Sequence, residues 1–142
     1  MKTADVIIVG SGASGLFNAL FLPQDYKVIV ITKKEVEESD SFLAQGGISA
    51  LKNPEDYDSY FEDTMKAGHY ENDKGAVEKM IKESPQIIQD LKDFGVRFDL
   101  KDGEIEFTRE GGHSTFRILH HEDLTGKEIT SHLYEEAKKR DN

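Results

Sequence analysis

Two short apolar runs near the start of the chain predict a pair of parallel β-strands. Residues 6–9 form an uninterrupted apolar run that stops at Gly10, and residues 27–32 contain a second such run. Continuous apolar runs are typical of strands that are buried on both faces of a parallel sheet. Between them, apolar residues recur at helical spacing over residues 16–20, until Pro23. The order strand, helix, strand indicates a right-handed crossover and an α/β fold.

The middle of the chain predicts one long loop followed by helices. Residues 33–53 lose periodicity and gather serines and glycines, and loops of this length are usually functional. A helix is expected from Pro54 until Gly68. A second helical stretch follows, and we expect residues 84–85 (Ser-Pro) to break it before Gly95 ends it.

The last third of the chain predicts a hairpin, a loop and a helix. Apolar and polar residues alternate over residues 96–107 around the turn sequence Asp-Gly at 102–103, which is typical of a β-hairpin. Residues 109–123 lack clear periodicity, so a polar loop is expected there. Thr125 and Glu128 have the spacing of a capping box, which predicts that a final helix begins at this point.

Composition excludes several classes of protein. The 142 residues contain 18 Lys and Arg against 28 Asp and Glu, a net charge of −10, which disfavours nucleic acid and anionic lipid as partners. No apolar run approaches the roughly 20 residues that span a bilayer, and the first run is too short for a signal peptide. Without cysteine the chain forms no disulfide and no cysteinyl flavin bond. We therefore expect a cytoplasmic protein that binds neither membranes nor nucleic acid.

The connection between the first strand and the first helix is rich in glycine. It reads Gly10, Ser11, Gly12, Ala13, Ser14 and Gly15. In this context Gly10 permits a tight turn, Gly12 lets a pyrophosphate approach the backbone, and Gly15 lets the helix lie close to the strand. The alternative is an ordinary tight connection without a ligand. The acidic residue expected about 20 positions later is replaced by Thr-Lys-Lys at residues 32–34, which disfavours NAD as the primary ligand.

Several motifs together resemble one family, the FAD-dependent flavoproteins that include the flavoprotein subunits of succinate dehydrogenase and fumarate reductase and also L-aspartate oxidase. The motifs are the glycine loop, Thr32-Lys33, Ala44-Gln45-Gly46-Gly47-Ile48, Thr108-Arg109-Glu110-Gly111-Gly112-His113-Ser114 and Thr125-Gly126. The resemblance implies an α/β fold: a Rossmann-like FAD-binding βαβ unit with additional helices and a β-hairpin. Members are several times longer, so residues 1–142 are expected to be an incomplete, N-terminal part of the FAD-binding domain, without the substrate-capping and C-terminal helical domains.

The resemblance also implies FAD as the cofactor. The expected contacts are the glycine loop, Lys33 and a segment that wraps the flavin, namely Asp40, Ser41, Phe42, Leu43, Ala44, Gln45, Gly46 and Gly47. Glycine suits a backbone that runs against a flat ring. In respiratory members a histidine in this segment carries flavin covalently. Asp40 stands at the equivalent position and cannot form that bond, so noncovalent FAD is expected.

The stretch from Arg109 to His113 is most similar to L-aspartate oxidase, which implies that Glu110 and His113 contact the substrate. A carboxylate opposite the ammonium group of L-aspartate supplies a charge-assisted hydrogen bond. The alternative is that Arg109 and Glu110 form a solvated loop pair. His113, His120 and His121 lack ligand spacing, so no metal site is expected. No catalytic residue is assigned with certainty in this chain.

The implied reaction is oxidation of L-aspartate to iminoaspartate, with electrons passed to oxygen or fumarate, in the pathway to quinolinate and NAD. Quinolinate synthase is then a candidate partner. The family's substrate-clamping residues lie beyond position 142, so the chain alone is expected to be inactive. The alternatives are a soluble fumarate reductase or succinate dehydrogenase flavoprotein fragment, and a non-catalytic nucleotide-binding module.

Overall fold

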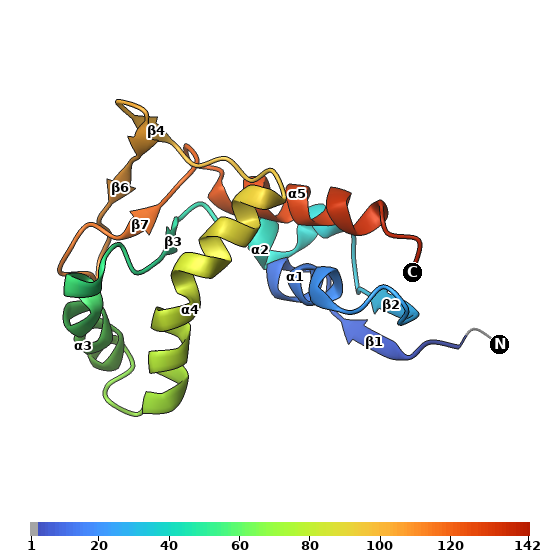
Figure 1. Ribbon diagram of the computed structural model, residues 1–142, viewed down its shortest axis with the longest axis horizontal. Helices are drawn as coiled ribbons and strands as arrows, with labels where there is room; N and C mark the ends of the chain where they lie inside the picture. Colours follow the sequence, from blue (N-terminus) through green and yellow to red (C-terminus); the bar gives the residue numbers. More distant parts are fainter. Residues whose placement is uncertain (1–2) are drawn as a thin grey trace. The chain divides into compact units, whose positions relative to one another are not determined.

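The computed structural model describes residues 3–142, which form two compact units (Figure 1). The first unit comprises the chain up to Gly46 together with residues 94–97 and 123–142. The second unit comprises residues 47–93 and 98–122. Among residues 3–142 no helix is both long enough and apolar enough to cross a membrane.

The first unit contains the predicted strand-helix-strand arrangement. Strands β1 (Val6–Val9) and β2 (Val28–Ile31) pair in parallel along their whole length, and helix α1 (Ala13–Phe21) connects them. The α/β fold expected from the apolar pattern is confirmed here.

The prediction that both faces of these strands are buried is wrong for the part of the chain that the structure describes. Ile8 lies on the face that α1 covers, where its Cγ2 atom would be 3.4 Å from a Cβ on Gly15. Ile7 and Val9 lie on the opposite face and are 61% and 81% exposed. The difference arises because no described element covers that second face.

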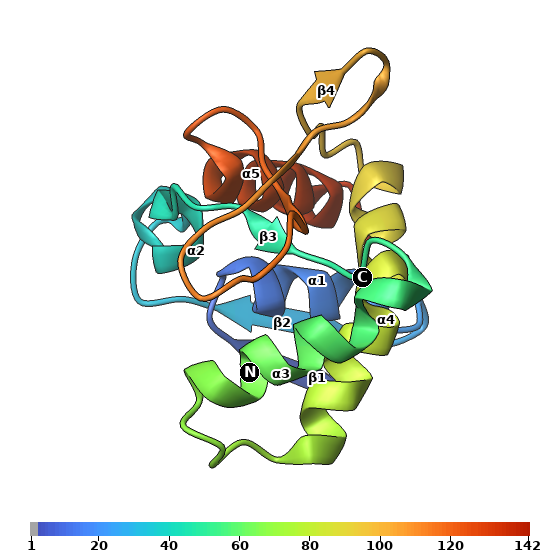
Figure 2. The same cartoon turned by 90° about the vertical axis from the view of Figure 1, so that its left-hand side faces the viewer.

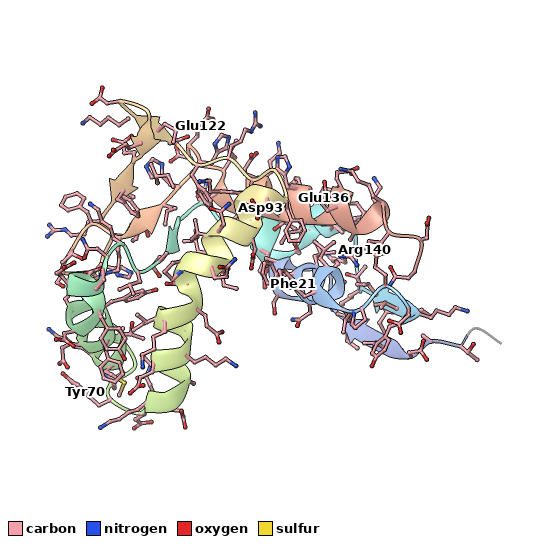
Figure 3. All side chains as sticks on the ribbon, viewed as in Figure 1. Phe21, Tyr70, Asp93, Glu122, Glu136 and Arg140 are labelled. Atoms are coloured by element: carbon pink, nitrogen blue, oxygen red, sulfur yellow. The ribbon has the colours of Figure 1, made fainter. Side chains whose placement is uncertain are left out.

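Helix α5 (Thr125–Lys138) packs against α1 and contributes to the core of the first unit. Leu16 of α1 and Leu133 of α5 are almost fully buried. At the end of α1 the rings of Phe17 and Phe21 stack at 4.5 Å, and both meet the edge of Phe94. The side chains of Phe21 and Arg140 are labelled in Figure 3, and the Arg140 guanidinium donates to the carbonyl of Leu20.

The start of α5 differs from the predicted capping box. Leu124 is the N-cap residue and makes no side-chain cap hydrogen bond, so Thr125 is the first residue inside the helix. The Glu128 carboxylate accepts hydrogen bonds from the backbone and side-chain nitrogens of Arg97, at 3.0 and 3.1 Å. The Glu128 carboxylate, which the capping-box pattern assigned to the helix N-terminus, therefore binds Arg97.

The expected loop over residues 33–53 carries short elements. They are the 3-10 helix η1 (Val36–Glu38), helix α2 (Asp40–Leu43) and strand β3 (Ile48–Ser49). Val36 is buried and anchors η1, and the Ser39 hydroxyl accepts from the backbone N–H of Phe42 to begin α2. The segment is therefore structured over much of its length, which its aperiodic sequence did not indicate.

The second unit contains a small antiparallel sheet in the order β3-β7-β6, with β6 at Phe107–Thr108 and β7 at Ile118–Leu119. Residues 109–123 are thus not wholly a polar loop, because they include the buried strand β7. The predicted hairpin is confirmed at its turn but is shorter than expected. It consists of β4 (Leu100–Lys101) and β5 (Glu104–Ile105) around a turn whose two residues both have positive φ.

Helices α3 (Tyr57–Ala67) and α4 (Lys74–Asp93) lie side by side in the second unit (Figure 2), and the 3-10 helix η2 (Pro54–Asp56) precedes α3. Their contact is a core of Tyr60, Met65, Val77 and Ile81. The predicted ends hold, because Gly68 caps α3, and Gly95, with φ of +89°, follows the end of α4.

The predicted break at residues 84–85 is wrong, because α4 continues through Pro85. Proline lacks the backbone N–H that would bond the carbonyl four residues earlier. Here the Ser84 hydroxyl donates to that carbonyl, Ile81 O, at 2.7 Å. The same hydroxyl accepts from the backbone N–H of Leu51 at 2.8 Å. Ser84 therefore replaces the lost helical bond.

Candidate functional site

An open groove of about 630 Å³ lies in the first unit, at the carboxyl ends of β1 and β2. This is the edge of a parallel sheet at which α/β folds bind ligands. Its lining residues are Val9, Gly10, Ser11, Gly12, Ile31, Thr32, Lys33, Lys34, Glu35, Glu38, Ser39, Asp40 and Ser41. Six predicted cofactor residues therefore line one groove: Gly10, Ser11, Gly12, Lys33, Asp40 and Ser41.

The other predicted cofactor residues lie outside the lining of this groove. Ala13, Ser14 and Gly15 form the first turn of α1. Phe42 and Leu43 end α2, and residues 44–47 connect α2 to β3. Gly46 and Gly47 belong to different units. A role for residues 42–47 at the flavin stays a prediction.

The glycine loop has the backbone geometry that its sequence predicts. Gly10 has φ of +112°, a conformation that side chains disfavour, and its N–H donates to Ile31 O at 2.8 Å. A Cβ on Gly15 would lie 2.1 Å from the carbonyl oxygen of Gly10. Only glycine at position 15 lets α1 begin this close to the end of β1.

The amino end of α1 is available to an anion. Gly12 is the N-cap residue, so no side chain caps the first N–H groups, and the first turn holds no acidic residue. Such a terminus offers unpaired N–H donors and a positive dipole end. The Ser11 hydroxyl donates to Thr32 Oγ1 at 2.9 Å and so ties the glycine loop to the end of β2.

Two lysines and two glutamates flank the groove. Lys34 pairs with Glu38 at 2.7 Å, but both side chains are more than half exposed, so the pair contributes little to stability. Lys33 forms no ion pair with any residue in the described range 3–142. Its ammonium group therefore remains available to a phosphate. Glu35 also lines the groove, a position that the sequence analysis did not single out.

Gly126, noted only as part of a family motif, proves to be a packing residue. Its N–H donates to the carbonyl of Ala44 at 3.0 Å. A Cβ at this position would lie 2.1 Å from the carbonyl oxygen of Ser41. Gly126 thus allows the start of α5 to support α2, which carries Asp40 and Ser41 to the groove.

In the second unit, the structure brings Glu110 and Gly47 together across 63 positions of sequence. Gly47 donates its backbone N–H to Glu110 Oε1 at 3.3 Å. Gly47 is also required by packing, because a Cβ there would lie 2.3 Å from Ile118 Cγ2 and 2.4 Å from Leu119 O. Close contact with β7 is therefore a reason for glycine that the sequence analysis missed.

His113 lies against a fully buried arginine that the sequence analysis did not identify. The side chain of Arg117 is 0% exposed, and its Nη1 lies 3.0 Å from His113 Nδ1. The guanidinium binds Asp56 through two hydrogen bonds of 2.8 Å and Asp63 through one of 2.6 Å. Arg117 lies in a stretch of mostly polar residues, so its burial was not predicted. The apolar pair at 118–119 was the only signal in this stretch of a buried strand.

The charges of this cluster are mutually stabilised. Hydrogen bonding to Arg117 lowers the pKa of Asp56 to about 2, against the opposing effect of burial. Burial tends to raise the pKa of Asp63, but hydrogen bonds from Ser114 and Arg117 outweigh it, and the net shift is downward. Both carboxyl groups are therefore ionised at neutral pH, opposite a permanent cation.

The three histidines considered together in the sequence analysis lie in different environments. His113 contacts Arg117, whereas His120 and His121 place their Nδ1 atoms 3.1 and 3.3 Å from the carboxylate oxygens of Asp99. His113 therefore contacts a cation, Arg117, whereas the other two histidines contact a carboxylate.

The residues of the groove fit the phosphates of a dinucleotide. The glycine loop, a helix terminus without a side-chain cap hydrogen bond and the cation Lys33 converge on one cavity, in which the Ser41 side chain lies next to Gly12. Anionic phosphates are stabilised by this combination even though the chain as a whole is acidic.

Comparison with known proteins agrees with this geometry. The family model described as FAD binding domain matches residues 5–141. L-aspartate oxidase from Clostridium perfringens is 43% identical over 141 residues, which cover 99% of this chain and 32% of that protein. L-aspartate oxidase from Clostridium acetobutylicum is 46% identical over 139 residues, with coverage of 97% and 32%.

Solved structures show the same fold. A quinol fumarate reductase structure from E. coli aligns with a TM-score of 0.90 at 25% identity and covers 97% of this chain and 24% of that one. Sdh1 from Mycobacterium smegmatis aligns with a TM-score of 0.85 at 31% identity, with coverage of 99% and 25%. The chain spans about a third of the length of the first two curated relatives. It belongs to the FAD binding domain family and has FAD as its cofactor.

Proposed function

We propose that this chain is the N-terminal part of the FAD-binding domain of an enzyme that oxidises L-aspartate to iminoaspartate. The names of the relatives at 43% and 46% identity support this substrate. The structural observation that carries the proposal is the Glu110 carboxylate, which is exposed and tethered through one oxygen to the backbone N–H of Gly47.

The tether suits Glu110 to recognise an amine. The hydrogen bond from Gly47 engages Oε1, and no described residue within 3–142 pairs with Oε2. An oriented carboxylate with a free oxygen forms a charge-assisted hydrogen bond with an ammonium group. Succinate and fumarate lack this group, so Glu110 would discriminate the amino acid from the dicarboxylates.

The first unit would hold the cofactor without a covalent bond. Bound FAD supplies the two-electron oxidation. The N-terminus of α1 and Lys33 would bind its phosphates, and Asp40 would lie at the flavin position that carries a histidine in respiratory members. Oxygen or fumarate would then accept the electrons, and quinolinate synthase is the candidate partner that would consume the product.

Titration of the purified chain with FAD, followed by flavin fluorescence, tests the cofactor part of the proposal. The expected result is saturable binding and full release of flavin on denaturation. Replacement of Lys33 by alanine should weaken binding, whereas replacement of exposed Lys66 by alanine, in the second unit, should not. Flavin that stays attached after denaturation would contradict noncovalent binding.

The Glu110→Gln variant of a complete enzyme that contains this chain tests the substrate. A hydrogen bond to a charged group contributes about 1.5–3 kcal/mol, so kcat/KM for L-aspartate should fall about tenfold to a hundredfold. Reduction of fumarate should change little. The matched control is Glu104→Gln, which makes the same chemical change at an exposed hairpin position. Equal losses for aspartate and fumarate would refute recognition of the ammonium group.

A second candidate function is that of a fumarate reductase or succinate dehydrogenase flavoprotein. The alignments with the E. coli and M. smegmatis structures favour it. The same complete enzyme would then reduce fumarate or oxidise succinate and leave L-aspartate unchanged.

The chain of 142 residues is proposed to be inactive by itself, because it covers about a third of its relatives. Assay of the purified chain with FAD and L-aspartate should show no turnover. Measurable turnover would mean that the substrate site is complete within these residues.

A further inference from the structure

We propose that Arg117 is a positioning residue that holds His113 in one tautomer, with its proton on Nε2. His113 then offers a hydrogen-bond donor, and not an acceptor, to an oxygen of a bound carboxylate. The assignment of that carboxylate to the substrate rests on the proposed function. The assignment of the tautomer does not.

The Arg117 side chain uses all of its N–H donors. Its five N–H groups match five contacts: two to Asp56, one to Ser59 Oγ at 2.7 Å, one to Asp63, and one to His113 Nδ1 at 3.0 Å. The guanidinium is fully buried and cannot turn to another partner without breaking an ion pair.

The guanidinium is also held from its face and through the neighbouring backbone. It lies over the ring of Tyr60, 4.8 Å from the ring centroid. Ser114 donates from both its N–H and its hydroxyl to Asp63 Oδ2, at 2.7 and 2.8 Å. Asp63 therefore fixes the Arg117 head group and the residue that follows His113 at once, so the distance between Arg117 and His113 is set by rigid partners.

The contact with Arg117 determines which nitrogen of His113 carries the proton. A guanidinium has donors and no acceptor. The imidazole nitrogen that faces it must therefore be the acceptor, and His113 Nδ1 carries no proton. The neutral ring then bears its proton on Nε2. A proton on Nδ1 would point directly at an N–H of Arg117.

His113 lines two neighbouring cavities in the second unit, with volumes of about 470 and 220 Å³, and both also include Gly112 and Asp63. Within residues 3–142 no described group forms a hydrogen bond with Nε2. This N–H is available to an external acceptor, and a carboxylate oxygen is the strongest acceptor that the proposed substrate offers.

Nitrogen-15 NMR of the histidine side chains tests the tautomer in the chain as it stands. The expected spectrum at alkaline pH shows His113 with protonated Nε2 and unprotonated Nδ1. His69 is exposed and serves as an internal reference for an imidazole in free tautomeric exchange. A population of the Nδ1–H form at His113 equal to or greater than that at His69 would overturn the proposal.

Two variants separate positioning from a general structural effect. Ser59→Ala removes a contact of Arg117 that does not involve His113, so the tautomer should be unchanged. Arg117→Lys cannot bridge Asp56 and His113 together, so the Nδ1–H population should rise toward that of His69. An unchanged tautomer in folded Arg117→Lys would overturn the role of Arg117. The wild-type spectrum decides the tautomer if that variant does not fold.

A complete enzyme gives a functional readout. A glutamine amide places its donor near the position of Nε2, whereas an asparagine amide places it near Nδ1. His113→Gln should therefore retain KM for the substrate within a fewfold, and His113→Asn should raise it about tenfold, as expected for loss of one hydrogen bond. The reverse order would overturn donation from Nε2. If the NMR spectrum is as expected but the complete enzyme does not oxidise L-aspartate, only the proposed function is contradicted.

Discussion

Replacement of Asp56 by asparagine tests how far the buried Arg117 cluster stabilises the second unit. Asp56 accepts two hydrogen bonds of 2.8 Å from Arg117 and one of 2.7 Å from Thr115. Asparagine preserves the size of the side chain but removes its charge. It also turns an N–H₂ group toward a guanidinium that has only donors.

The magnitude follows from the pKa of Asp56. A decrease from 3.8 to about 2 corresponds to about 2 kcal/mol of preferential stabilisation of the ionised form in the folded state. Removal of one partner of a buried pair costs about 3–5 kcal/mol, because the remaining charge is left uncompensated. Asp63 still neutralises Arg117 in the variant. We therefore expect a loss of about 2–4 kcal/mol in the free energy of unfolding.

The effect has a defined dependence on pH. The folded pKa of Asp56 lies below its unfolded value, so this stabilisation is complete above about pH 4 and is lost as pH falls through about 2. The difference between wild type and Asp56→Asn should be constant from pH 5 to 8. It should shrink below about pH 4, where the Asp56 carboxyl group becomes protonated in the unfolded wild-type chain while it is still ionised in the folded one.

Urea denaturation followed by circular dichroism measures the difference. Asp58→Asn is the matched control, because Asp58 is exposed in the first turn of α3, two residues after Asp56, and forms no ion pair with a residue in the range 3–142. The control should change stability by only a few tenths of a kcal/mol. If Asp56→Asn is no more destabilising than Asp58→Asn at pH 7, the buried Arg117 cluster does not stabilise the second unit.

Two further changes test the glycine loop and the proline within α4. Gly15→Ala would place a Cβ 2.1 Å from Gly10 O, so FAD titration should show lost or strongly weakened binding, whereas Gly75→Ala in α4 should bind normally. Equal affinity for the two variants would contradict the close approach of α1. Ser84→Ala leaves the Leu51 N–H without its acceptor, and urea denaturation should show a loss of about 1–3 kcal/mol. A change below 0.5 kcal/mol, roughly that of a neutral surface substitution, would argue against the role of this hydroxyl.

Local signals predicted the elements whose cause is local. The apolar runs located β1 and β2, helical periodicity located α1, α3 and α5, and the Asp-Gly pair located the hairpin turn. Prediction failed where a side-chain hydrogen bond altered a rule about the backbone. Pro85 should end a helix by its own chemistry, but the hydroxyl of Ser84 satisfies the carbonyl that Pro85 leaves open.

The candidate site shows the same division. The glycine loop and Lys33 could be located because each lies just after the end of a predicted strand. The structure brings them to one groove. Glu110 and His113 were identified only through family resemblance. Their partners, Gly47 and Arg117, are contacts of the folded chain, and no periodicity in the sequence indicates either one.

The strand-helix-strand order, the glycine loop and the absence of cysteine chemistry follow from the sequence alone. Each depends on residues adjacent in the chain or on composition alone. The burial of Arg117 between Asp56 and Asp63 depends on the tertiary fold, since these carboxylates lie 61 and 54 positions away in the sequence. Burial of a charge is tolerable only where opposite charges and hydrogen bonds surround it, and the fold assembles that environment from separate segments.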